Sequence, residues 1–284
     1  MRLNRKLLFG LLVSILFGNF LFYAYIMTKL RKVVVFDLDE TLGHFVELGM
    51  FWGALENYYK KKLPISKFFE TMDIFPEFLR PHIFEILKYL IKQKKRKECH
   101  KVIIYTNNQG PKSWTEMISK YFNWKLNYKV FDKVIASFKI DGKQIEMCRT
   151  SHSKKYTDLL RCSKLPDNTK VCFLDDQYHP HMDDKRVFYI NSKPYVHELS
   201  YHEMAQRYYS NTKMNEDRGV FINDIVAFMN RYHFTPQIKH ASKQKLDNVI
   251  SKRIMEYLKL FFSKEDIPKT RRHPKAKKRR TYKA

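Results

Sequence analysis

The sequence contains no closely spaced pair of cysteines. Its four cysteines are Cys99, Cys148, Cys162 and Cys172. None of them shows the Cys-x-x-Cys spacing of a structural zinc site. Their wide separation also indicates no disulfide framework of the kind that staples small secreted domains. The cysteines therefore favour a protein of a reducing compartment.

A nucleotide-binding P-loop is also missing, and no other recognisable nucleic-acid module occurs, so we expect no nucleotide cofactor.

Negative charge is scarce: the chain has 29 Asp and Glu against 54 Lys and Arg, which gives a net charge of +25. Such a balance favours acidic partners, namely nucleic acid, anionic lipid or phosphorylated protein.

Enough apolar residues are present for a sizeable core. Hydrophobic residues make up 44% and aromatic residues 15% of the 284 positions, which excludes global disorder. One α/β domain with extensions is the simplest organisation for this length. The predicted parts are an apolar segment at 1–29, a main domain at 30–200 with an insertion at 45–77, a helical extension at 201–264 and a basic tail at 265–284.

The N-terminal segment is apolar and uncharged from Leu7 to Met27, long enough to cross a bilayer. Basic residues flank both of its ends, so the positive-inside rule does not fix its orientation. Three interpretations are open: a membrane anchor, a signal peptide, or an upstream extension with translation starting at Met27. An anchor would leave the main domain in the cytosol or nucleoplasm, and a start at Met27 would give a soluble nuclear or cytoplasmic protein.

Between Lys269 and Lys283, the C-terminal tail carries nine Lys or Arg and no acidic residue. With two prolines and no apolar period, it is typical of a disordered basic arm. Such an arm contacts polyanions, directs nuclear import or only adds solubility, and the sequence leaves these alternatives open.

Three short apolar runs begin at Lys32, Lys101 and Lys170 and end in polar residues. Their continuous apolarity predicts strands buried on both faces of a parallel sheet. Amphipathic segments at 78–93, 111–122 and 153–163 predict helices between them, and 215–233 and 241–263 predict two more. A strand pair is predicted around Asp141–Gly142. The fold class is therefore α/β, a Rossmann-type parallel sheet flanked by helices.

Polar side chains follow each run, at the edge where parallel α/β sheets gather their reactive groups. They are Asp37, Asp39, Glu40, Thr41, Thr106, Asn107, Asn108, Asp175 and Asp176. Carboxylates crowded in one pocket repel one another, and a hard divalent cation with oxygen ligands relieves that repulsion. The pattern therefore predicts a Mg²⁺ site.

The run "DLDET" after an apolar strand resembles the D-x-D-x-T signature of the haloacid dehalogenase superfamily. "FDLDETLGHF" followed by "LRPHIFEILKYL" looks most like its branch of NLI-interacting-factor-like phosphatases, which includes small phosphatases of the RNA polymerase II C-terminal domain. The resemblance implies that Asp37 is the nucleophile and a metal ligand. It makes Asp39 the general acid and base, with its backbone carbonyl on the metal, and gives Thr41 the task of steadying the loop.

The remaining roles also follow from the resemblance. Thr106 and the backbone amide of Asn107 would hold the phosphoryl oxygens. The family's lysine before Asp-Leu is replaced here by Thr157, so Lys154 or Lys155 would serve, with Lys154 preferred. The family's last motif, usually Asp-Asn, is Asp-Asp here: Asp176 would bind the metal directly and Asp175 would support it.

The predicted function is a Mg²⁺-dependent phosphatase that removes phosphate from phospho-Ser or phospho-Thr of a protein through an aspartyl-phosphate. Two alternatives are open. The positive charge suits a phosphatase of nucleic-acid 3′ ends. The apolar N-terminus suits a catalytically silent, membrane-tethered scaffold of the same fold.

Overall fold

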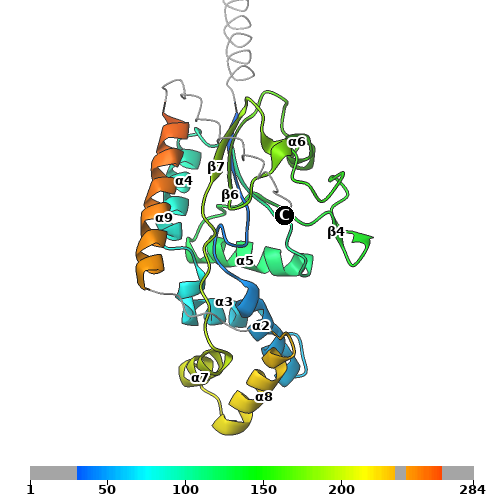
Figure 1. Cartoon of the computed structure of the whole chain (residues 1–284), viewed down its shortest axis with the longest axis vertical. Coiled ribbons are helices and arrows are strands. Elements are labelled where there is room, and N and C mark those ends of the chain that lie inside the picture. Colours follow the sequence, from blue (N-terminus) through cyan, green and yellow to red (C-terminus); the bar gives the residue numbers. More distant parts are fainter. Residues whose placement is uncertain (1–30, 234–240, 264–284) are drawn as a thin grey trace, which may run out of the picture.

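The computed structural model describes residues 31–233 and 241–263 of the chain. Within them, a five-stranded parallel sheet forms the centre and helices lie on both of its faces (Figure 1). Its strands, in spatial order, are β3 (Lys133–Ile135), β2 (Lys101–Tyr105), β1 (Lys32–Phe36), β6 (Lys170–Asp175) and β7 (Val187–Asn191). The predicted α/β class with a parallel sheet is confirmed.

The three predicted strands form the middle of the sheet. β1 pairs with both β2 and β6, and Phe36 lies opposite Ile104 on one side and Leu174 on the other. The outer strand β7 had not been predicted, and β3 lies at the start of the segment predicted as the first strand of the pair around Asp141–Gly142. β3 has only three residues, and β7 is partly exposed, so neither shows the long apolar run of a central strand.

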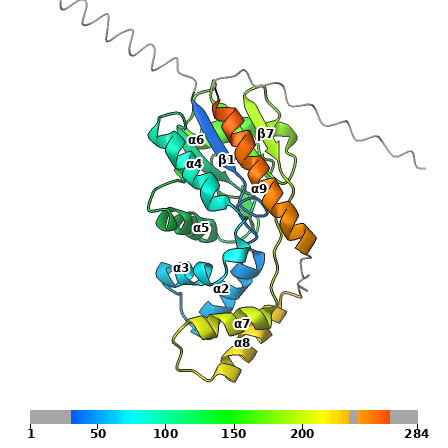
Figure 2. The ribbon, with the colours of Figure 1, turned by 90° about the vertical axis from the view of Figure 1, so that its left-hand side faces the viewer.

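Both faces of the sheet are covered. Val34 and Phe36 of β1 pack into one apolar cluster, whereas Val33 and Val35 pack into another. The first cluster includes α4 (Ile83–Lys95), α5 (Lys112–Lys125) and α9 (Ala241–Phe262), and the second includes α6 (Tyr156–Ser163). Figure 2 shows α9 running beside α4 across the first face. Burial on both faces explains why the strands are continuously apolar.

α4 and α6 both begin later than the sequence predicted. α4 starts at Ile83 instead of residue 78: Pro81 disfavours helical backbone in the residue before it, and His82 has a left-handed φ of 60°. α6 starts at Tyr156 instead of residue 153, because Lys155 is extended, with φ −126° and ψ 141°. Lys154 and Lys155 therefore lie in the loop before α6.

The predicted insertion is helical and packs against part of the C-terminal extension. It forms α2 (Val46–Tyr58) and α3 (Ile65–Ile74), followed by a 3₁₀ turn, η1 (Pro76–Phe78). Phe51 of α2 contacts Phe75 and also Tyr208 of α7 (Tyr201–Asn211). Tyr58 contacts Phe221 of α8 (Arg218–Asn230). With α9 on the sheet, α7, α8 and α9 therefore share one core with the main domain.

The strand pair predicted around Asp141–Gly142 is present as a short hairpin. β4 (Lys139–Ile140) pairs antiparallel with β5 (Lys143–Gln144). Asp141 and Gly142 both have positive φ, 49° and 77°, as a two-residue hairpin turn requires. A second 3₁₀ turn, η2 (Pro180–Met182), follows β6.

The expectation that no disulfide forms was wrong. Cys148 and Cys162 are joined by a disulfide, with their Cα atoms 5.1 Å apart. The loop before α6 folds back along that helix, and Arg161 Nε donates a hydrogen bond to the carbonyl of Cys148 at 2.8 Å. The pairing depends on this reversal of the chain, which cysteine spacing alone does not reveal. Cys99 and Cys172 are free and buried.

No helix of residues 31–233 or 241–263 combines the length and apolarity needed to span a membrane. The predicted anchor at 7–27 and the basic tail at 265–284 lie outside the described residues.

If α9 is part of the core, Leu258→Ala should destabilise the protein. Leu258 is fully buried against the sheet, and its truncation should cost about 2–5 kcal/mol through lost apolar contacts and a cavity. Urea unfolding of the full chain measures this. Val249 lies on the same helix but is 62% exposed, so Val249→Ala should change stability by less than about 0.5 kcal/mol. Equal effects of the two substitutions would contradict the packing of α9 on the sheet.

Candidate active site

The carboxyl ends of the three central strands bring the predicted residues together. Asp37 follows β1, Thr106 follows β2 and Asp175 ends β6. One carboxylate oxygen from each of Asp37, Asp175 and Asp176 can be chosen so that the three oxygens lie within 4.8 Å of one another. Because neighbouring strands stop at the same edge of the sheet, residues separated by well over a hundred positions form one cluster.

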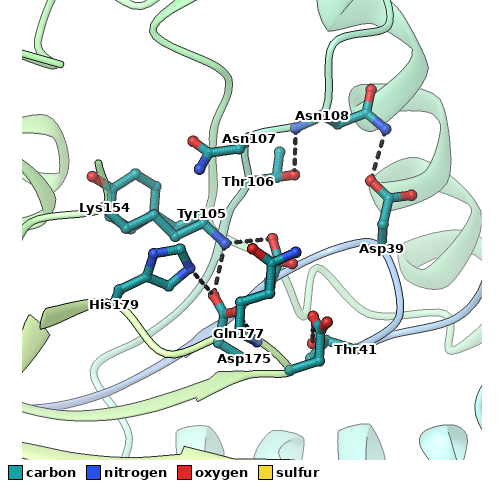
Figure 3. A network of polar contacts seen from close by, with 12 residues as sticks. Asp39, Thr41, Tyr105, Thr106, Asn107, Asn108, Lys154, Asp175, Gln177 and His179 are labelled. Carbon is teal, nitrogen blue, oxygen red and sulfur yellow. Dashed lines mark hydrogen bonds and ion pairs between the residues drawn. The ribbon is translucent and has the colours of Figure 1, made fainter. Parts of the chain in front are cut away.

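Lys154 lies across this acidic cluster. Its side chain is buried, and its Nζ atom is 2.6 Å from Asp37 Oδ1 and 2.7 Å from Asp175 Oδ2. Figure 3 shows Lys154 directed toward Asp175, with His179 beside them. The neighbouring Lys155 takes another direction, since its Nζ donates to Thr150 Oγ1 at 3.2 Å. The structure thus brings Lys154, and not Lys155, to the carboxylates.

Burial and charge act against each other in this cluster. Burial raises the pKa of Asp37, although Lys154 partly offsets the effect. Burial would also raise the pKa of Asp175, but contacts with His179 and Lys154 outweigh it and the pKa falls. For Lys154, burial favours the neutral amine, yet the two carboxylates raise its pKa overall. An ionised Lys154–Asp175 pair therefore lies at the centre of the site.

Asp39 lies on the opposite side of the site, next to the loop after β2. Its Oδ2 atom accepts a hydrogen bond of 2.7 Å from Asn108 Nδ2. Burial raises the pKa of Asp39 to about 7, and the hydrogen bond from Asn108 opposes that rise. A carboxyl group with a pKa near neutrality exchanges protons readily in both directions, as general acid–base catalysis requires.

The loop after β2 is held by its own polar groups. The backbone N–H of Asn108 donates to Thr106 Oγ1 at 3.0 Å, and Asn108 Oδ1 accepts from the backbone of Gly110 at 2.8 Å. These contacts fix the loop so that the Asn108 side chain points toward Asp39, as Figure 3 shows. Asn108 was expected at this edge of the sheet, but its contact with Asp39 was not predicted.

Asp176 extends the acidic cluster toward the turn after β1. Its Oδ1 atom is 3.5 Å from Thr41 Oγ1, which donates to it. Burial, together with the charges of Asp37 and Asp175, raises the pKa of Asp176 to about 6. Asn191 Nδ2 holds this part of the chain by donating to the carbonyls of Asp175 and Asp176.

Asp175 has little free bonding capacity. Its Oδ1 atom accepts from the backbone of Gln177 at 2.9 Å, and its Oδ2 atom contacts both Lys154 and His179 Nε2, the latter at 3.2 Å. It therefore supports its neighbours, and Asp176 is the freer candidate ligand. His179 lies four residues beyond Asp175, in the segment after β6.

Two buried arginines, neither predicted, fix the loops of the site. Arg80 Nε donates to the carbonyl of Thr41 at 2.6 Å, and its Nη2 donates to the carbonyls of Glu40 and Lys193. Arg80 thereby holds the turn after Asp37. The only sequence signal was the Arg-Pro pair that ends the insertion.

Arg149 holds the other side. Its Nη1 donates to the carbonyls of Thr106 and Ala136, each at 2.9 Å. Its Nη2 donates to Asn107 Oδ1 at 2.7 Å and to the carbonyl of His152 at 2.8 Å. One guanidinium group therefore connects the loop that carries Thr106 to the loop that carries Lys154. It also holds the side chain of Asn107 through a hydrogen bond to Oδ1.

The acidic cluster fits a hard divalent cation. All three clustered side chains offer carboxylate oxygens, and mutual repulsion and burial already raise the pKa of two of them, Asp37 and Asp176. A cation bound there would relieve both effects. Asp37 and Asp176 would hold it.

The chain matches no protein-family model, no curated protein and no solved structure. Its function must therefore be inferred from its own residues.

Proposed function

We propose that the protein is a Mg²⁺-dependent phosphatase of the haloacid dehalogenase type that hydrolyses phosphomonoesters through an aspartyl-phosphate. The observation that carries the proposal is the position of Lys154, whose Nζ atom lies within 2.7 Å of both Asp37 and Asp175. A buried ammonium beside a candidate nucleophile is a fixed positive charge where a phosphoryl group would gain negative charge. The order of the motifs along the chain, similar to that of the NLI-interacting-factor-like branch, supports the same chemistry.

In the proposed reaction, a carboxylate oxygen of Asp37 attacks phosphorus and the bond from phosphorus to the leaving oxygen breaks. Protonated Asp39 gives its proton to the leaving oxygen. Ionised Asp39 then takes a proton from water, whose oxygen attacks the phosphorus of the aspartyl-phosphate, so that phosphate leaves and Asp37 is regenerated. A pKa of Asp39 near 7 suits both steps.

Three groups of the chain would hold the phosphoryl oxygens during both steps: the Lys154 ammonium, the Thr106 hydroxyl and the backbone N–H of Asn107. Arg149 and Asn108 fix the positions of Thr106 and Asn107. Magnesium, when bound, neutralises the acidic cluster and polarises the phosphoryl group.

The substrate class we propose is phospho-Ser or phospho-Thr in a protein. The net charge of +25 favours association with acidic phosphopeptides. A nucleic-acid end phosphate would gain from the same charge, but the chain lacks a recognisable nucleic-acid module. A silent scaffold is disfavoured because both Asp37 and Asp39 are present and lie in the site.

Turnover of p-nitrophenyl phosphate tests the reaction. Wild type should hydrolyse it with Mg²⁺ and lose turnover with a chelator, and Asp37→Asn should lower kcat more than about a thousandfold, because the nucleophile is lost. Circular dichroism of the variant controls for folding. Metal-independent turnover, or equal turnover by Asp37→Asn, would contradict the proposal. The kcat/KM values for a phosphopeptide and a 3′-phosphorylated oligonucleotide then decide between the two substrate classes.

The two adjacent lysines provide a matched pair of variants. Lys154→Met should lower kcat by about 10²–10³-fold, since it removes a preorganised cation from the phosphoryl group. Lys155→Met should leave kcat within about twofold, because Lys155 contacts Thr150 instead. Steady-state kinetics with Mg²⁺ measures both. Equal losses, or a larger loss for Lys155→Met, would show that the assignment of Lys154 is wrong.

A further inference from the structure

A second group of ionisable side chains lies outside the proposed phosphatase site. His44 lies in the loop between β1 and α2, Glu47 in the first turn of α2, and Glu198 in the segment between β7 and α7. One nitrogen or oxygen atom from each residue can be chosen so that all three lie within 4.8 Å of one another. The three residues therefore converge from two distant parts of the chain.

The inner atoms of this group are buried, and one of them lacks a partner. Glu47 is fully buried and His44 is nearly so. His44 Nε2 and Glu47 Oε2 lie 2.8 Å apart, in ion-pair contact. Glu47 Oε1 has no hydrogen-bond partner. Because buried polar atoms in proteins are nearly always satisfied, this oxygen indicates a ligand at the group.

The other ring nitrogen of His44 is already occupied. Nδ1 lies 3.0 Å from Glu40 Oε1, in hydrogen-bond contact. Histidines that bind metals typically donate their second ring N–H to a carboxylate, which fixes the tautomer and orients the ring. A proton on Nδ1 would leave the lone pair of Nε2 for a metal shared with Glu47 and Glu198.

We propose that His44, Glu47 and Glu198 bind Zn²⁺. An imidazole nitrogen with carboxylate oxygens suits zinc, whereas magnesium prefers oxygen ligands alone, as at the cluster of Asp37 and Asp176. Donor atoms about 2.0 Å from a tetrahedral zinc are about 3.3 Å apart. The separations here, 2.8 Å for His44 to Glu47 and up to 4.8 Å in the group, bracket that value.

The zinc site connects the turn after β1 to the C-terminal part of the chain. His44 lies three residues after the end of the "DLDET" run. Glu198 belongs to a segment that already contacts this run, because the backbone N–H of Tyr195 donates to the carbonyl of Glu40 at 2.8 Å. Zinc would therefore clamp the turn that carries Asp37 and Asp39. The site does not depend on the proposed phosphatase activity.

Zinc binding by the full chain tests the proposal. Metal-free protein is dialysed against graded Zn²⁺ in excess Mg²⁺, which occupies the all-oxygen cluster, and bound zinc is measured by mass spectrometry. Wild type should retain one tight equivalent of zinc per chain and unfold at a higher temperature when zinc is present. Glu47→Gln, which keeps the shape of the side chain but removes its charge, should bind that equivalent at least about tenfold more weakly.

Asp176→Asn is the matched control, because it alters the other acidic cluster and should keep the zinc equivalent. If Glu47→Gln does not fold, Glu198→Gln, at a half-buried position, takes its place with the same expected loss. The proposal is overturned if wild type takes up no tight zinc, or if the glutamine variant that folds binds zinc as tightly as wild type. The latter result would leave His44 as a charged partner of Glu40 and Glu47 only.

Discussion

The site depends on one buried ammonium group placed between two carboxylates. Lys154 lies between Asp37 and Asp175, and its charge offsets part of the cost of burying the two acids. The contact joins the end of β1, the end of β6 and the loop before α6, so it forms only when all three are in place. The disulfide from Cys148 to Cys162 ties this loop to α6, and Arg149 ties it to the loop after β2.

The sheet supplies the precision that this contact needs. β1 lies between β2 and β6 with Phe36 opposite both Ile104 and Leu174, so the residues that follow emerge side by side. Two guanidinium groups then fix the loops by donating to backbone carbonyls, Arg80 for the turn after β1 and Arg149 for the loop after β2. Each buried arginine spreads its charge over several acceptors, which offsets the cost of its burial.

The sequence predicted what local pattern determines. The central strands and their acidic ends are visible as apolar runs followed by Asp37, Thr106 and Asp175, because burial on both faces leaves a clear pattern. It did not reveal β7, which is partly exposed, or the disulfide, which depends on a reversal of the chain. The roles of Arg80 and Arg149 are invisible for a related reason: a buried arginine and a solvent-exposed one look alike until the carbonyls around them are known.

The most direct test of the central claim is a crystal structure of the protein with Mg²⁺ and beryllofluoride, a mimic of an aspartyl-phosphate. The account predicts beryllium bonded to a carboxylate oxygen of Asp37, with Lys154 Nζ and Thr106 Oγ1 within hydrogen-bond distance of its fluorines. An unmodified Asp37, or a Lys154 ammonium directed away from Asp37 and Asp175, would contradict it.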